Sequence, residues 1–236
     1  MSGPLEGQVA LVAGASRGIG AAIAEALAAA GAHVVLAARS TADLEAVEER
    51  IHGLGGAATI APLDLATGDG IARLAQAMAE RWDALDLLVL NAAMLGTLGP
   101  AAQIGGREFN RLLTLNVLVP QALIAAFDPL LRKSAAGRVI GITSSVGAKP
   151  RAYWGAYGAS KAALDTLLTA YAQEVGNVTS IKVAIVDPGA TATAMRALAY
   201  PGEDPATLKP PARVAGAVID LLGRDFESGC RLEVEG

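Results

Sequence analysis

The stretch VALVAGASRGIG at residues 9–20 decides the fold. Its first five residues are apolar and form a run of the length of a buried β-strand, and glycines follow at positions 14, 18 and 20. A helical pattern begins at Gly18, in which Ile23 and Leu27 stand one turn apart. A strand, a glycine-rich turn and a helix in this order bring backbone N–H groups close to a phosphate. The stretch therefore predicts a dinucleotide-binding βα unit.

Outward from this unit, short apolar runs alternate with longer helical patterns. The predicted strands are 9–13, 33–38, 57–63, 87–90, 138–143 and 181–186, with a weaker one at 230–234. The predicted helices are 18–30, 42–53, 69–82, 107–133, 155–176 and 212–222. The runs at 87–90 and 181–186 show little polar alternation, which is typical of strands covered on both faces. We therefore expect residues 1–236 to form a single Rossmann-like α/β domain, a doubly wound parallel sheet of about seven strands with helices on both faces.

Composition excludes several functional classes. The chain is 53% hydrophobic and 18% charged, which excludes bulk disorder. Its net charge is −4 and it has no Lys/Arg run, so we expect no nucleic-acid and no membrane partner. One cysteine (Cys230) and two histidines (His33 and His52) predict neither an internal disulfide nor a metal site. The start of the chain has no secretory signal pattern, and we expect a cytoplasmic protein.

The end of the predicted second strand indicates the cofactor. It reads Ala37-Ala38-Arg39 and offers no carboxylate, the group that binds the ribose 2′-hydroxyl of NAD in such folds. Arg39, together with Arg17 in the glycine turn, would instead hold a 2′-phosphate through charge-assisted hydrogen bonds. Two solvated arginines are the alternative. The pattern favours NADP(H) over NAD(H).

Three further side chains suggest proton chemistry. Tyr157 and Lys161 stand one turn apart on one face of the predicted helix 155–176. An ammonium beside a phenol lowers the phenol pKa and makes it a usable acid or base nearer neutral pH. Ser144 lies at the end of the fifth predicted strand, where a hydroxyl can hydrogen-bond a substrate carbonyl, and Ser145 is the alternative. An ordinary amphipathic helix with a snorkelling lysine would show the same Tyr–Lys spacing.

Together these segments resemble the short-chain dehydrogenase/reductase family, from about Gly7 to the C-terminus. The motifs that carry the resemblance are AGASRGIG at 13–20, LDL at 63–65, LNAAM at 90–94, LN at 115–116, ITSSVG at 142–147, YGASK at 157–161 and DPGATAT at 187–193. The chain departs from the family pattern twice. It reads Leu90-Asn91-Ala92-Ala93 where the family usually has Asn-Asn-Ala-Gly, and Ala13 where threonine is usual. We expect both changes to affect stability or cofactor affinity before chemistry.

The resemblance implies a catalytic tetrad of Asn116, Ser144, Tyr157 and Lys161. Tyr157 would be the general acid for carbonyl reduction, Lys161 would lower its pKa and hold the nicotinamide ribose, and Ser144 would polarise the carbonyl. Asn116 would hold a proton-relay water. Pro120 cannot donate a helical N–H to the Asn116 carbonyl, which would leave that oxygen free for the water, although a proline kink serving only packing is equally compatible.

The resemblance also implies a set of residues that bind the cofactor. Asp64 and Leu65 would flank the adenine, Asn91 would lie along the adenosine, and the segment 188–193 would grip the carboxamide. The implied set is Gly14, Ser16, Arg17, Gly18, Ile19, Gly20, Arg39, Asp64, Leu65, Asn91, Ala92, Tyr157, Lys161, Pro188, Gly189, Thr191 and Thr193.

We therefore expect an NADP(H)-dependent oxidoreductase acting on CH–OH donors, which interconverts a ketone or aldehyde and an alcohol by hydride transfer. A lid at 194–211 would cover an apolar carbonyl substrate. Lys149 and Arg151 would suit an anionic one, although solvated surface charge is the commoner role of such residues. The expected apolar pocket residues are Met94, Leu95, Val146, Tyr153 and Trp154.

Two other functions remain as alternatives, and we also expect the chain to form an oligomer. A non-catalytic NADPH-binding sensor or scaffold is the first alternative, and an intact tetrad argues against it. An epimerase or dehydratase is the second, and the short C-terminal part argues against it. The resemblance further implies a homodimer or homotetramer built from the predicted helices 107–133 and 155–176.

Overall fold

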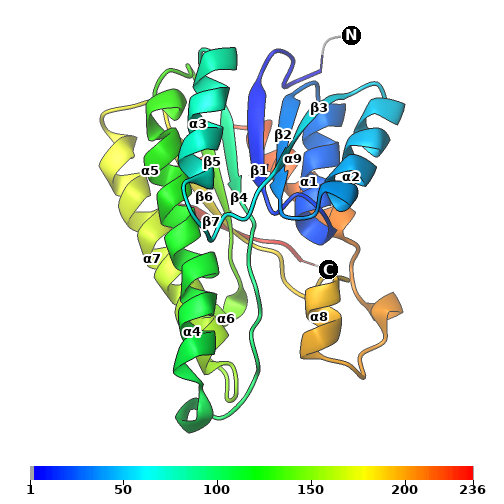
Figure 1. Ribbon diagram of the computed structural model, residues 1–236, viewed down its shortest axis with the longest axis vertical. Helices are drawn as coiled ribbons and strands as arrows, with labels where there is room; N and C mark the ends of the chain where they lie inside the picture. Colours follow the sequence, from blue (N-terminus) through cyan, green and yellow to red (C-terminus); the bar gives the residue numbers. More distant parts are fainter. Residues whose placement is uncertain (1–2, 236) are drawn as a thin grey trace.

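A parallel sheet forms the centre of the computed structural model, which describes residues 3–235 (Figure 1). Within this range seven strands pair in the order β3-β2-β1-β4-β5-β6-β7, and every pairing is parallel. The strands are β1 (Val9–Ala13), β2 (His33–Ala38), β3 (Ala57–Pro62), β4 (Leu87–Leu90), β5 (Arg138–Ile142), β6 (Lys182–Asp187) and β7 (Cys230–Glu233). The order reverses between β1 and β4, which opens a crevice outside the carboxyl ends of these two strands. The predicted fold class is confirmed.

Burial on both faces explains the apolar runs. All five residues of β1 are buried, with Ala10 and Val12 in one core and Leu11 in the other. The first core lies under α1 (Gly18–Ala29), α2 (Thr41–Gly53) and α9 (Pro211–Leu222). The second lies under α3 (Gly70–Arg81), α5 (Val119–Leu131) and α7 (Gly155–Gly176). Figure 1 shows these two groups of helices on opposite sides of the sheet.

The helix predicted at 107–133 changes pitch in its middle. It consists of α4 (Gly106–Leu113), a π-helical turn (Thr114–Leu118) and α5. In the turn, the backbone N–H of Val119 bonds to the carbonyl of Thr114, five residues back. Pro120 follows at once and has no N–H to offer, which favours a break in the regular i→i−4 pattern at this point.

The same helical run, Gly106–Leu131, is long and apolar enough to cross a membrane by length and composition alone. A core helix of a globular protein passes the same test. Here Leu123, Phe127 and Leu131 are fully buried against the sheet. The apolar face of α5 is therefore used in the core.

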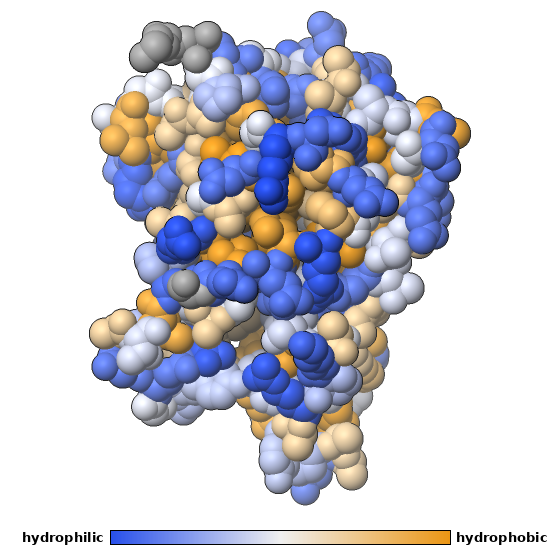
Figure 2. All heavy atoms as spheres, turned by 180° about the vertical axis from the view of Figure 1, so that it is seen from behind, coloured by the Kyte–Doolittle hydropathy of each residue, from blue (hydrophilic) through white to orange (hydrophobic). Residues whose placement is uncertain are grey.

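Two short helices beyond the sheet were not predicted. α6 (Ser145–Ala148) directly follows β5, and α8 (Ala194–Ala199) occupies part of the expected lid. Both are too short to show a helical period in the sequence. α4 and α6 project past the carboxyl edge of the sheet on one side and α8 on the other (Figure 1). Figure 2 shows, from behind, the notch between these two projections.

Candidate active site

The glycine turn is shaped by a close approach of the loop after β4. A Cβ atom on Gly20 would lie 2.1 Å from the Gly14 carbonyl oxygen and 2.4 Å from the Asn91 amide nitrogen. That amide donates a hydrogen bond of 2.9 Å to the same carbonyl. Gly14 also has a φ of +79° and sits against Ala92. Glycine is therefore required at both positions for Asn91 to close the turn.

The first turn of α1 suits an anion. Arg17 occupies the N-cap position without a side-chain cap, and the first turn contains no acidic residue. Helix-terminal N–H groups without such partners, together with the helix dipole, favour a phosphate. A groove of about 470 Å³ adjoins this turn and is lined by Ser16, Arg17 and Gly18 together with residues of α1, α2 and α9.

Of the residues that depart from the family pattern, Ala13 and Leu90 lie in the core, whereas Ala93 is half-buried. Ala13 and Leu90 are buried among the residues between the sheet and α3, α5 and α7. Their side chains contribute to packing, whereas Asn91 keeps the amide that holds the glycine turn.

Asn116 joins the loop after β4 to α7. Its side chain is fully buried, and its amide oxygen accepts from the Met94 N–H (2.9 Å). Its amide nitrogen donates to the Met94 carbonyl (2.9 Å) and to the Ser160 hydroxyl (3.0 Å). The Ser160 hydroxyl in turn donates to the Tyr157 carbonyl (2.8 Å). The side-chain N–H groups of Asn116 are therefore both occupied. The water expected at Asn116 would bind its main-chain carbonyl, and it stays a prediction.

Tyr157 and Ser144 face each other at the base of the crevice. Tyr157 is buried, its hydroxyl lies 3.9 Å from the Met195 sulfur, and the nearby Ser144 hydroxyl acts to lower its pKa. Ser144 precedes α6 with an extended backbone. The Ser145 hydroxyl instead lies 3.5 Å from the Arg151 guanidinium. Of the two serines, Ser144 is the one placed against Tyr157.

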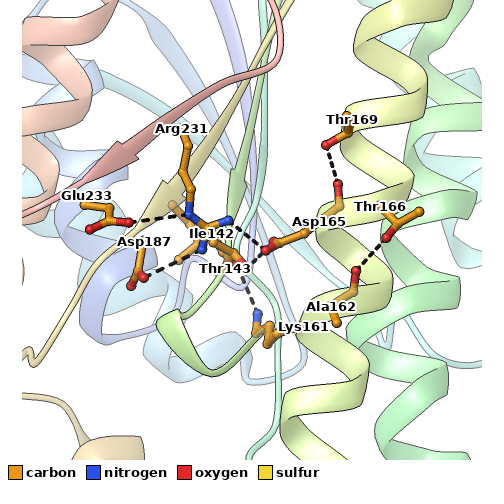
Figure 3. A network of polar contacts seen from close by, with 10 residues as sticks. All are labelled: Ile142, Thr143, Lys161, Ala162, Asp165, Thr166, Thr169, Asp187, Arg231 and Glu233. Carbon is orange, nitrogen blue, oxygen red and sulfur yellow. Dashed lines mark hydrogen bonds and ion pairs between the residues drawn. The ribbon is translucent and has the colours of Figure 1, made fainter. Parts of the chain in front are cut away.

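Lys161 lies beneath this pair and is almost completely buried. Its ammonium donates to the Ile142 carbonyl (2.9 Å; Figure 3) and is 5.7 Å from the centre of the Tyr157 ring. Burial lowers the pKa of Lys161 to about 8, although Asp165 and Asp187 act in the opposite direction.

The expected direction of the Tyr157 pKa is wrong for this structure. Burial raises the pKa of Tyr157 above its ordinary value, and the Asp187 carboxylate raises it further. The Ser144 hydroxyl opposes this effect without reversing it. Desolvation dominates because the phenol lies in an apolar cluster, while the Lys161 ammonium is directed to a backbone carbonyl.

A polar network behind Lys161 was missed by the sequence analysis (Figure 3). Arg231 on β7 donates to Asp165 on α7 (2.7 Å) and lies 3.7 Å from Asp187 at the end of β6. The other Asp165 oxygen accepts from the Thr143 hydroxyl, and Asp187 also accepts from the Gly189 N–H (3.0 Å). The position of Asp187, at a strand end directly before Pro188 and Gly189, could have marked it in the sequence as a site residue. No local pattern marks Arg231, because Asp165 and Asp187 lie far from it in the sequence.

The other predicted cofactor residues lie on loops that leave the carboxyl ends of strands. Arg39 follows β2, Asp64 and Leu65 follow β3, and the segment 188–193 follows β6. Thr193 caps α8 by accepting from the Arg196 N–H (3.1 Å), and it lies beside Gly18 of the glycine turn. Leu65 is mostly buried in the core. Arg17 and Arg39 are exposed, and neither pairs with a carboxylate within residues 3–235.

A cavity of about 190 Å³ opens above Ser144. Its lining residues are Ser144, Ser145, Val146, Arg151, Trp154, Asp187, Gly189, Ala190, Arg196 and Tyr200. Of the expected pocket residues, Val146 and Trp154 line it, while Met94 and Leu95 belong to the apolar cluster beside Tyr157. Tyr153 is 64% exposed and lies outside. The cavity is more polar than expected because α8 brings Arg196 into its wall.

Comparisons with known proteins agree with the fold described above. The family model for short chain dehydrogenases matches residues 8–204. The uncharacterized oxidoreductase YciK of Escherichia coli is 37% identical over 224 residues, which cover 94% of this chain and 88% of that protein. A short chain dehydrogenase from Salmonella enterica serovar Typhi has a TM-score of 0.95 at 34% identity and covers 100% of this chain and 99% of its own. A structure from Escherichia coli in complex with NADPH has a TM-score of 0.93 at 35% identity, with all of both chains covered.

Replacing Arg231 tests the network in Figure 3. Arg231→Leu leaves the Asp165 and Asp187 carboxylates without their shared cation in a largely buried place, and we expect it to lower the unfolding free energy by about 2 kcal/mol. Urea unfolding measures this value. Glu233→Gln is the matched control, because Glu233 is 71% exposed and 3.9 Å from Arg231, so its effect should be small. Equal unfolding midpoints for the two variants would contradict the role given to the network.

Proposed function

Because this chain belongs to the short-chain dehydrogenase family, we propose that it is an NADP(H)-dependent oxidoreductase that interconverts a carbonyl compound and an alcohol. The observation that carries the proposal is the juxtaposition of Ser144, Tyr157 and the buried Lys161 at the carboxyl edge of the sheet. We further propose that residues 1–236 form one NAD(P)-binding domain.

Reduction of a carbonyl needs a hydride at carbon and a proton at oxygen. The nicotinamide of the cofactor supplies the hydride when it is bound. Tyr157 donates the proton from its hydroxyl to the carbonyl oxygen, and its raised pKa keeps the phenol protonated at neutral pH for this step. Ser144 holds the same carbonyl oxygen through its hydroxyl.

Lys161 and Asn116 support this step from below. Lys161 holds the nicotinamide ribose by its ammonium, and its pKa of about 8 lets it exchange a proton near neutral pH. Asn116 fixes the loop after β4 and the start of α7 relative to each other, which positions Tyr157. Its main-chain carbonyl holds the water that returns a proton toward Lys161.

The cofactor site is assigned to the carboxyl edge around the crevice. The first turn of α1 with its glycines at 14, 18 and 20 takes the pyrophosphate. Asp64, Leu65, Asn91 and Ala92 line the adenosine side, and the segment from Pro188 to Thr193 grips the carboxamide. Arg17 and Arg39 pair with the 2′-phosphate, and the NADPH complex of the Escherichia coli structure supports this preference.

Tyr157→Phe tests the reaction. The variant keeps the ring in its cluster but lacks the proton donor, so we expect NADPH-dependent reduction of carbonyl compounds to fall at least about 100-fold. Initial rates of NADPH oxidation against a panel of aldehydes, ketones, quinones and keto esters measure the loss. NADPH binding, followed by calorimetry, should change little.

Tyr171→Phe is the matched control, since Tyr171 lies toward the other end of α7, where its hydroxyl donates to Asp128 on α5. Tyr171→Phe should retain turnover. Wild-type turnover that survives in Tyr157→Phe would refute the proposed role, and binding of NADPH without turnover of any panel compound would favour a sensor or scaffold.

Cofactor preference tests the two exposed arginines. In Arg39→Gln, and separately in Arg17→Gln, we expect kcat/KM for NADPH to fall about tenfold while the value for NADH stays close to that of the wild type, because only NADPH carries the 2′-phosphate. Arg50→Gln is the control, since Arg50 lines the neighbouring groove but pairs with Glu25. A wild-type preference for NADH would overturn the assignment of NADP(H).

The remaining proposals concern assembly and location. We place the protein in the cytoplasm as a homodimer or homotetramer, associated through α4, α5 and α7. Leu118, in the π-helical turn between α4 and α5, is 58% exposed, which fits a face covered by a second copy. Size-exclusion chromatography with light scattering should give a multiple of the monomer mass, and a clean monomer would contradict the proposal.

A further inference from the structure

Two guanidinium groups reach the cavity above Ser144, and one of them is already neutralised. Arg196 on α8 donates to both carboxylate oxygens of Glu203, at 2.5 and 2.6 Å. The same guanidinium stacks on the Tyr200 ring at 3.8 Å. Its charge is therefore balanced within the lid itself.

The second guanidinium, that of Arg151, belongs to an exposed residue and has only neutral hydrogen-bond partners. It lies 3.5 Å from the Ser145 hydroxyl and 3.4 Å from the Tyr200 hydroxyl, so it spans the cavity from α6 to the lid. Within residues 3–235 no carboxylate lies within salt-bridge distance of it. Asp187 also lines the cavity, but its carboxylate accepts from Gly189 and faces Arg231.

The segment that carries Arg151 is held in a strained turn. Tyr153 has a φ of +70°, which among the described residues is otherwise found only at glycines. Its carbonyl accepts from the Gly99 N–H (2.9 Å), and the Trp154 N–H donates to the Arg151 carbonyl (3.2 Å). Such strain persists only where the surroundings enforce it, and it is concentrated at functional sites. Here it places Arg151 and Trp154 together on the cavity wall.

We propose that the substrate carries a carboxylate, which pairs with Arg151 while its carbonyl group lies at Ser144 and Tyr157. The planar fork of a guanidinium matches a carboxylate, and the uncompensated cation makes the site selective for an anion over its neutral analogue. A cavity of about 190 Å³ suits a short oxo acid. This inference rests on the proposed function and replaces the expected apolar substrate with an acidic one.

Trp154 supplies a direct binding signal. The chain has two tryptophans, and Trp82 lies beside His33, away from the cavity, so a Trp82→Phe background leaves Trp154 as the reporter. We would titrate this protein, in the presence of NADP⁺, with 4-oxopentanoate, 5-oxohexanoate and the methyl ester of each. The acids should bind about tenfold more tightly than their esters, and added NaCl should weaken the binding of the acids alone.

Arg151→Gln should abolish the difference between acid and ester, and Arg151→Lys should restore part of it as a point charge. Lys149→Gln is the matched control, because Lys149 is an exposed cation two residues away that does not line the cavity. This control should retain the full difference. The proposal is overturned if neither acid binds more tightly than its ester, or if Lys149→Gln loses the difference as Arg151→Gln does.

NADPH oxidation by the same four compounds separates this inference from the proposed function. Faster turnover of the acids than of the esters supports both. Turnover of the esters at rates equal to the acids overturns the carboxylate site and leaves the oxidoreductase function standing. Arg151-dependent binding of the acids without NADPH oxidation keeps the carboxylate site and counts against the reductase activity.

Discussion

The parallel sheet requires cover on both faces, and most of the architecture follows from that constraint. Strands such as β1 and β4 are buried throughout, so helices must pack on each side of them. The helices that connect β1 to β3 pack on one side and those that connect β3 to β6 pack on the other, and the strand order reverses between β1 and β4. The loops that leave the carboxyl ends of β1 and β4 therefore run to opposite sides of the sheet. Between them lies the crevice in which the glycine turn and the Asn91 loop meet.

The burial that stabilises the fold also sets the chemistry of the site. Tyr157 and Lys161 lie at the carboxyl edge of the sheet, where the core ends. Desolvation raises the pKa of Tyr157 and lowers that of Lys161, which in both cases favours the neutral form of the group. Asp165 and Asp187 partly compensate for the buried ammonium, and Arg231 keeps the two carboxylates close without an excess of negative charge. The last strand thus contributes to the site although its residues do not line the crevice floor beside Tyr157.

The cavity above Ser144 has a charged mouth, and an apolar cluster lies beside it. Met94, Leu95 and Met195 surround Tyr157, whereas arginines and hydroxyls lie toward the lid. Arg151 and Arg196 differ in their partners, because α8 and the turn that follows it bring Glu203 to Arg196 and not to Arg151. Charge at this mouth therefore depends on how the lid folds, and not on how many basic residues the segment contains.

The sequence by itself determined the elements whose signals are local. The strands 9–13, 33–38 and 87–90 and the helix 155–176 have the predicted bounds, because the signal for each of them lies in one continuous stretch of residues. The one-turn spacing of Tyr157 and Lys161 is local in the same sense. Only the tertiary structure decided the contact of Arg231 with Asp165, the direction of the Tyr157 pKa and the pairing of Arg196. These depend on burial and on contacts that local residue patterns do not encode, several of them between residues far apart in the chain.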